Sequence, residues 1–92
     1  MNQVAGITMQ NDEIKALIET GIAGCEAIVT GDGSHFQAIV ISESFAGEST
    51  LNKQRNVYAT LGDHITSGEI HAMTIKAFTP AEWAQAQKLQ IG

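Results

Sequence analysis

The sequence is poor in residues that cross-link or stiffen a chain, with one cysteine and one proline in 92 residues. A single thiol cannot form an internal disulfide, and cysteine-poor chains are typical of reducing compartments, so we expect a cytoplasmic protein. Cys25 opens a short alternating apolar stretch without an adjacent base or cation. We therefore interpret it as a small buried residue rather than a reactive thiol.

Positive charge is also scarce, with five Lys and Arg against ten Asp and Glu, a net charge of −5 and a pI near 4.9. This balance argues against broad electrostatic capture by nucleic acid or by an anionic membrane. No apolar run approaches the length of a membrane span, and no basic segment followed by an apolar run opens the sequence, so we expect neither a membrane anchor nor a secretion signal.

Several enzyme signatures are missing as well. The sequence has no phosphate-binding Walker loop, no Gly-x-Ser-x-Gly elbow and no dinucleotide fingerprint. Its carboxylates are scattered, and none form a pair whose spacing suggests acid/base catalysis. We expect a protein that is not an enzyme.

What remains is enough for one small domain, since 43% of the residues are apolar. Residues 1–10 show little periodicity and are predicted to form a flexible arm, which leaves 11–92 as a single domain. The predicted class is α+β, with helices covering one face of a three-stranded sheet. In chain order we predict a helix capped by Asn11 or Asp12, strands at 25–30 and 35–42, a loop at 42–49, one helix or two over 51–66, a strand at 70–77 and a helix from Pro80.

Local signals support several of these elements. The trio Gly31–Gly33 suits a tight hairpin turn, and the strand that follows is apolar on both faces, which predicts a central strand. The tetrad Gly21–Gly24 is interpreted as a helix stop, because it lacks the cation of a phosphate-clamping Gly-x-x-Gly loop. Apolar residues of the 51–66 segment fall near one helical face: Leu51, Tyr58, Leu61 and Ile65.

The last third of the sequence places His71 near the start of an apolar strand that leads into a marked helix start. Thr79 can cap this helix, Pro80 suits its first position and Glu82 can complete a capping box. A histidine held at a sheet end is either a packed polar residue or a ligand. His64 lies beside Asp63 on the preceding helical segment, and we interpret it as solvated.

Five motifs in this order resemble the BolA family, and two of them, Gly-Asp-Gly-Ser-His-Phe and Thr-Pro-Ala-Glu-Trp, resemble its IbaG-like branch. The resemblance extends over about residues 11–90. The motifs lie at Gly31–Gln37, Phe45–Ser49, Lys53–Tyr58, Ile70–Ala72 and Thr79–Trp83.

The resemblance implies a fold related to the class II KH domain and a monothiol glutaredoxin of the CGFS type as partner in a heterodimer. It also implies a glutathione-ligated [2Fe-2S] cluster shared with that partner, in iron–sulfur trafficking, iron homeostasis or the stress response. His71 is the implied ligand, and His35 best fits a second ligand from the hairpin. The isolated chain would be a monomer or a weak homodimer.

This implied chemistry agrees with the composition. A chain with one cysteine cannot hold an iron–sulfur cluster alone, but a neutral imidazole can replace a thiolate and raise the reduction potential. Lys53, Arg55 and Lys76 are natural contacts for an acidic partner surface or a glutathione carboxylate. Many family members read Arg-His-Arg where this chain reads Lys53-Gln54-Arg55, so no role for that middle imidazole applies here.

An alternative is a DNA-binding transcriptional regulator that uses the KH-like fold. This interpretation requires Lys53, Arg55 and Lys76 to line one basic face despite the negative total charge. Binding would then weaken steeply with added salt.

Overall fold

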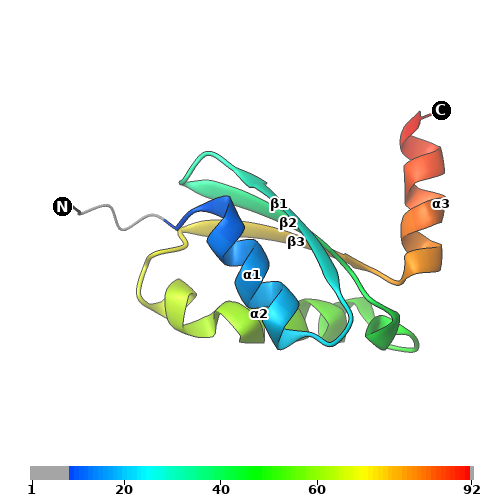
Figure 1. The fold of residues 1–92 in the computed structure, drawn as a ribbon, viewed down its shortest axis with the longest axis horizontal. Helices are drawn as coiled ribbons and strands as arrows, with labels where there is room; N and C mark the ends of the chain where they lie inside the picture. Colours follow the sequence, from blue (N-terminus) through cyan, green and yellow to red (C-terminus); the bar gives the residue numbers. More distant parts are fainter. Residues whose placement is uncertain (1–8, 92) are drawn as a thin grey trace.

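The computed structural model describes residues 9–91 and confirms the predicted order of elements and the α+β class. Figure 1 shows their arrangement. A single helix occupies the segment for which one helix or two had been predicted. The elements are α1 (Asn11–Gly21), β1 (Glu26–Gly31), β2 (His35–Ile41), the 3-10 helix η1 (Glu43–Phe45), α2 (Thr50–Thr66), β3 (Ala72–Phe78) and α3 (Pro80–Ile91).

The sheet has the order β1-β2-β3, so β2 is central, as predicted. β1 and β2 form an antiparallel hairpin, whereas β3 pairs with β2 in parallel. The hairpin turn uses Gly33 at a φ of +99°, and the Asp32 carboxylate accepts hydrogen bonds from the backbone N–H groups of Ser34 and His35. Because parallel strands need a crossover, α2 carries the chain back to the end of the sheet where β2 begins.

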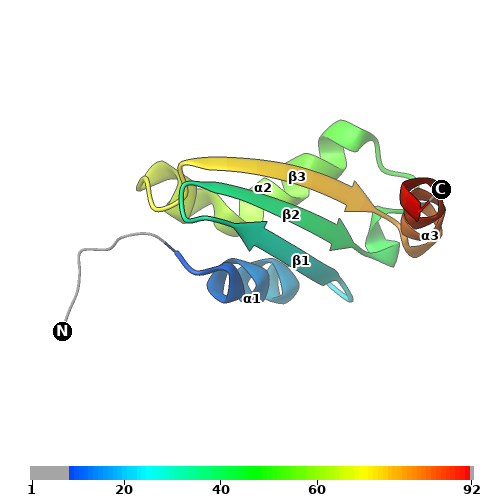
Figure 2. The same cartoon turned by 90° about the horizontal axis from the view of Figure 1, so that it is seen from above.

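Helices α1 and α2 lie side by side on one face of the sheet, which leaves the other face open in Figure 2. The core forms between them, because alternate residues of each strand point toward the helices. Phe45 of η1 closes this core and is only 1% exposed, although the segment was predicted as a plain loop. Other core residues are Ile14, Ile18, Ala38, Val40, Val57, Leu61 and Ile75.

Helix α3 departs from the expectation that the helices cover one face. It stands at the end of the sheet where β2 and β3 finish (Figures 1 and 2). Its first turn contacts the sheet through the rings of Phe78 and Trp83, whose centroids are 5.3 Å apart. The predicted capping box is present, since Thr79 N–H donates to Glu82 Oε1 at 2.8 Å and Glu82 N–H donates to Thr79 Oγ1 at 3.2 Å.

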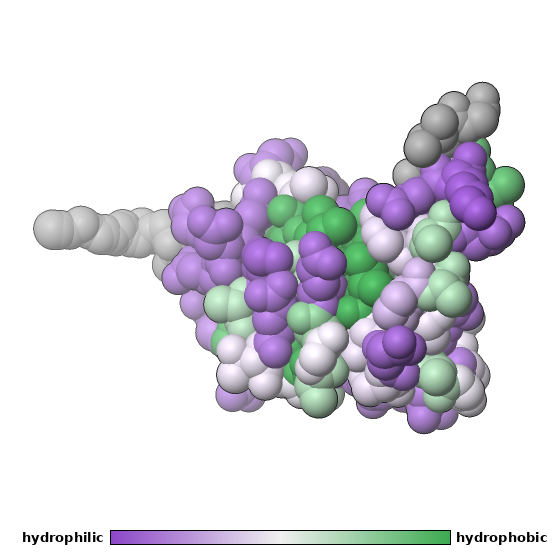
Figure 3. Space-filling view, turned by 45° about the vertical axis from the view of Figure 1, so that its right-hand side comes forward, coloured by the Kyte–Doolittle hydropathy of each residue, from purple (hydrophilic) through white to green (hydrophobic). Residues whose placement is uncertain are grey.

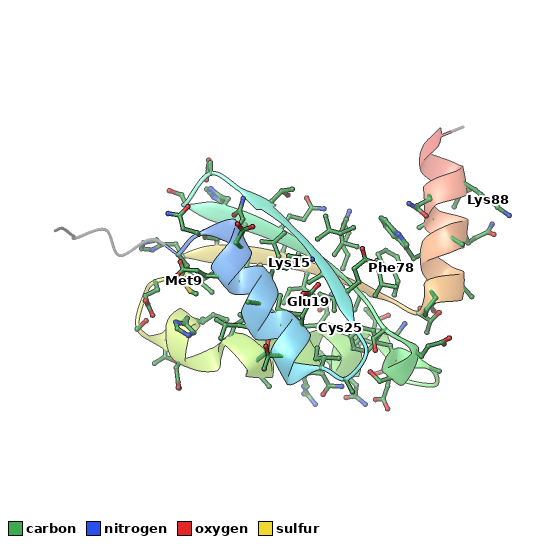
Figure 4. The ribbon with its side chains drawn as sticks, viewed as in Figure 1. Met9, Lys15, Glu19, Cys25, Phe78 and Lys88 are labelled. Carbon is green, nitrogen blue, oxygen red and sulfur yellow. The ribbon has the colours of Figure 1, made fainter. Side chains whose placement is uncertain are left out.

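Polar side chains from the covering helices occupy both edges of the sheet. At β1, the N–H of Ala27 donates to Glu19 and its carbonyl accepts from Lys15, while these two side chains pair at 2.7 Å. Figure 4 shows Lys15 and Glu19 between α1 and β1. At β3, the carbonyls of Met73 and Ile75 accept hydrogen bonds from side chains of α2. Such contacts leave less of each edge open to pairing with another chain.

The domain begins earlier than the predicted boundary at residue 11. Met9 is buried in the core, and the backbone N–H of Gln10 donates to Glu13 Oε1. Gln10 is the N-cap of α1, so the prediction of Asn11 or Asp12 as the cap was wrong. The rest of the predicted arm, residues 1–8, lies outside the described residues.

The buried stripe of α2 differs in part from the prediction, although Leu61 is buried and Ile65 packs against the core as expected. Leu51 is 57% exposed and Tyr58 is 39% exposed, whereas Lys53, Val57 and Leu61 face the core. The prediction considered only apolar residues, so it did not place Lys53 on the buried face of α2.

The surface mixes apolar and polar patches, and Figure 3 shows apolar surface in the middle of one side, bordered by hydrophilic side chains. Within residues 9–91, no helix combines the length and the hydropathy required to span a bilayer.

Candidate ligand site at one end of the sheet

The parallel pairing of β2 and β3 brings two histidines to the same end of the sheet. His35 is the first residue of β2 and is the register partner of Ala72, the first residue of β3. His71 immediately precedes Ala72, so it lies at this same sheet end, as its predicted position near the strand start required. Since neighbouring strands run about 4.8 Å apart, the two histidine backbones are close although they lie 36 positions apart in the sequence.

His35 is exposed next to the hairpin turn. Its side chain lies on the face away from the helices, because the next residue, Phe36, is buried against them. A shallow cleft of about 340 Å³ on this face is lined by His35, Gln37 and Thr74. Hydrogen bonds from the backbone N–H groups of His35 and Ser34 lower the pKa of the Asp32 carboxyl, so the turn keeps a negative charge beside the imidazole.

His71 is exposed, and its ring forms no hydrogen bond with any residue in the described part of the chain. The imidazole is therefore open to solvent and is not a satisfied interior group. This matters because a walled-off ring with both nitrogens occupied could not bind a ligand from outside.

His64 has a different environment. Its Nδ1 lies 2.8 Å from Glu69 Oε1, and Ser67 Oγ donates to the same oxygen at 3.0 Å. The hydrogen bond with His64, followed by that from Ser67, lowers the pKa of the Glu69 carboxyl. His64 is thus half-buried and engaged with a carboxylate, whereas the sequence had predicted a solvated side chain.

The donor set is small. Across residues 9–91, no group of three or more His, Cys, Asp and Glu side chains is arranged to hold a metal ion. His35 and His71 offer two imidazoles, so a metal or cluster at this end would need further ligands from another molecule.

The three cations named from the sequence separate into two kinds. Arg55 and Lys76 are exposed, as a partner contact requires. Lys53 is only 7% exposed, and its ammonium donates to Glu82 Oε1 at 2.9 Å. Lys53 therefore differs from the exposed cation expected from the sequence, because it joins α2 to the first turn of α3.

Sequence reasoning missed this pair and the cleft of about 360 Å³ that it borders. One signal was available: Lys53 precedes Val57 and Leu61 by four and eight residues, the spacing of one helical face. A lysine in that register is a candidate for burial with a partner.

The remaining sequence features are structural. Cys25 is half-buried, its thiol donates to the Ile18 carbonyl at 3.6 Å, and burial, followed by the nearby Glu19 charge, raises the pKa of the thiol. This environment disfavours the reactive thiolate. The tetrad Gly21–Gly24 ends α1 as predicted, and Gly24 adopts a φ of +64° there.

Comparison with known proteins agrees with this architecture. A family model described as BolA-like protein matches residues 9–82. The chain is 47% identical over 81 residues to the acid stress protein IbaG of Escherichia coli K12, covering 88% of this chain and 96% of that protein. It is similar to the structure of a bolA protein homologue from Coxiella burnetii, with 40% identity, a TM-score of 0.76 and coverage of 84% of this chain and 99% of that one.

A plant domain extends the likeness. The BolA domain of SufE1 from Arabidopsis thaliana is 30% identical, with a TM-score of 0.69 and coverage of 78% of this chain and 93% of that one. The assignment to a family rests on the family model and on the 47% identical protein of Escherichia coli. The chain belongs to the BolA family, in its IbaG-like branch.

Proposed function

We propose that this protein is a non-enzymatic partner of a monothiol CGFS glutaredoxin and shares a glutathione-ligated [2Fe-2S] cluster with it in the cytoplasm, in iron–sulfur trafficking or iron homeostasis. His71 supplies one ligand and His35 supplies the second. The observation that carries the proposal is the position of the two exposed histidines at one end of the sheet, joined by the β2–β3 register.

The donor chemistry supports sharing rather than independent binding. Iron–sulfur clusters are normally held by thiolates, and the single cysteine of this chain is half-buried with a raised thiol pKa. Two imidazoles can complete a coordination sphere whose thiolates come from the glutaredoxin and glutathione. Imidazole in place of thiolate raises the reduction potential of a cluster. Binding of this protein would therefore raise the reduction potential of the cluster held by the glutaredoxin.

The rigid placement of His35 also supports this role. His35 is the first residue of β2 and pairs with Ala72 of β3. The turn before it is held by the Asp32 carboxylate, which accepts two backbone hydrogen bonds. Ligands held on strands and tight turns lose less conformational freedom on binding than ligands on long loops.

The test is to mix the protein with cluster-loaded glutaredoxin and follow visible circular dichroism. We expect a new spectrum with the wild-type protein, its loss with His71→Ala and a weakened or altered form with His35→Ala. His64→Gln is the matched control, because His64 is engaged with Glu69 and lies outside the proposed ligand set.

An unchanged spectrum on mixing the wild-type protein would remove the proposal. The same conclusion follows if His71→Ala changes the spectrum as fully as the wild-type protein does. Size-exclusion chromatography of the mixture separates loss of the ligand from loss of the heterodimer.

The DNA-binding alternative is weaker in this structure. It required Lys53, Arg55 and Lys76 to act together, and the Lys53 ammonium is buried against Glu82. The other two of these cations, Arg55 and Lys76, on a chain of net charge −5 give little of the phosphate neutralisation on which non-specific DNA binding depends.

A further inference from the structure

A cleft of about 360 Å³ opens between α2, the outer edge of β3 and the first turn of α3. Thr50 and Lys53 line it from α2, Ala77 from β3 and Glu82 from α3. It lies at the far end of β3 from His71, about 17 Å along the strand at roughly 3.3 Å per residue. The cleft is therefore separate from the proposed cluster site.

The outer edge of β3 is hydrogen-bonded to side chains of α2 up to the cleft and is open within it. Tyr58 donates to the carbonyl of Met73 at 3.2 Å, and Gln54 donates to the carbonyl of Ile75 at 3.2 Å. Alternate residues of a strand direct their backbone groups to the same edge, so Ala77 points its N–H and carbonyl outward as well. No described residue supplies a partner for these outward groups of Ala77, which face the cleft.

The cleft also contains a buried cation whose hydrogen-bonding capacity is not filled. Lys53 is nine-tenths buried, and a lysine ammonium carries three donors, of which Glu82 Oε1 occupies one. Lys76 also lines the cleft, but alternation from the buried Ile75 directs its side chain to the face of the sheet away from α2. Glu82 is half-exposed, and the oxygen that accepts from Lys53 also accepts the Thr79 N–H.

We propose that this cleft binds the C-terminal end of an extended peptide. The peptide backbone pairs with the open edge at Ala77, and its terminal carboxylate accepts hydrogen bonds from the Lys53 ammonium and the Thr50 hydroxyl. Addition of a strand to a sheet edge supplies backbone hydrogen bonds, and the buried cation selects the chain end. This inference does not rest on the proposed function.

A free small anion fits less well than a peptide end. A carboxylate alone would contact Lys53 but would leave the N–H and carbonyl of Ala77 unpaired at the floor of the cleft. A peptide end satisfies both sets of groups at once, since each residue brings one donor and one acceptor.

The experiment is a titration of the full chain with the tripeptide acetyl-Val-Ser-Val, followed by amide chemical shifts in solution NMR. The same peptide with a carboxamide end is the matched control, and sodium acetate tests a free carboxylate. At millimolar peptide we expect shifts at Ile75, Ala77 and Thr50, and affinity about tenfold weaker for the carboxamide, the scale of one charge-assisted hydrogen bond.

Two variants move the affinity in opposite directions. Glu82→Gln keeps an acceptor for Thr79 but frees Lys53, so it should tighten peptide binding about threefold or more. Lys53→Met keeps the buried chain length but removes the charge, so it should abolish the preference for the free acid. The NMR spectrum of each variant verifies its fold.

Absence of shifts at Ile75 and Ala77 in the wild-type protein would overturn the proposal. Equal affinity for acid and carboxamide, or weaker binding by Glu82→Gln, would overturn it as well. If acetate alone produces the full set of shifts, the cleft is an anion site and the peptide assignment is wrong. None of these outcomes depends on glutaredoxin or iron.

Discussion

Glu82 holds two parts of the chain together with one carboxylate. It accepts the backbone N–H of Thr79 at the start of α3, and it accepts the buried ammonium of Lys53 from α2. These bonds, the Thr79 N–H first and Lys53 second, lower the pKa of the Glu82 carboxyl. The docking of α3 should therefore depend on the ionised form of a single side chain.

This dependence has a defined sign. A lowered folded-state pKa means that the contribution of Glu82 is complete above its usual value of 4.5 and is lost as pH falls through the lowered value. Because Trp83 is the only tryptophan and contacts Phe78, its fluorescence should change in that acidic window. In Glu82→Gln this part of the pH profile should be absent. A profile identical in both proteins would contradict the role given to Glu82.

The histidines show how far residue-level reasoning extends. The sequence placed His71 at a sheet end and His35 directly after the hairpin turn, and both positions agree with the structure. Helical spacing made Lys53 a candidate for burial, but the partners of His64 and Lys53 could not be predicted, because they lie across a turn or on another helix. Glu69 and Glu82 become neighbours of these residues only in the folded chain. The ligand roles of His71 and His35 stay predictions.

At the scale of elements, α2 gives the sharpest contrast between pattern and packing. Val57 is fully buried, whereas Leu51 is 57% exposed although its apolar character suggested a core position. Truncation of a buried valine to alanine removes two methyl groups and leaves a cavity.

We therefore expect Val57→Ala to lower the free energy of unfolding by about 2 kcal/mol. The matched variant Leu51→Ala should change it by less than about 0.5 kcal/mol. Urea denaturation measures both values, provided that the slope of the transition is unchanged. Similar losses for the two variants would mean that the face of α2 has been assigned wrongly.

The elements that sequence predicted well share a local cause. The hairpin turn depends on neighbouring Gly and Asp residues, and the start of α3 depends on Thr79, Pro80 and Glu82 within one turn. The phase of α2 and the burial of Phe45 depend instead on which surfaces meet in three dimensions. Apolar periodicity could not reveal them, since a buried lysine interrupts one pattern and a short 3-10 helix has no periodic signal.

At the scale of the whole molecule, stability is divided unevenly. Helices α1 and α2 share one core with the sheet, whereas α3 meets the sheet mainly through Phe78–Trp83 and meets α2 through the Lys53–Glu82 pair. Leu89, near the far end of α3, is 74% exposed. Regions with few buried apolar contacts open locally at a lower free energy than the core.

Native-state hydrogen exchange should therefore show two classes of amide. Amides in the second half of α3 should exchange with low protection, and those of α1, β2 and the middle of α2 should exchange only near the global unfolding free energy. Protection of α3 equal to that of α1 would contradict this division. The exchange of β2 serves as the internal control, because this strand is central to the sheet.

The parallel register of β2 and β3 has a consequence for the newly made chain. α1, β1 and β2 can assemble from neighbouring sequence, but β3 joins only after α2 has crossed back over the sheet, because contacts between distant segments form at a greater entropic cost. During synthesis, His35 is therefore in place well before β3 pairs with β2 and brings His71 to the same sheet end. The two histidines therefore come to lie at the same end of the sheet only in the finished domain, so a ligand that required both could not be held by an incomplete chain.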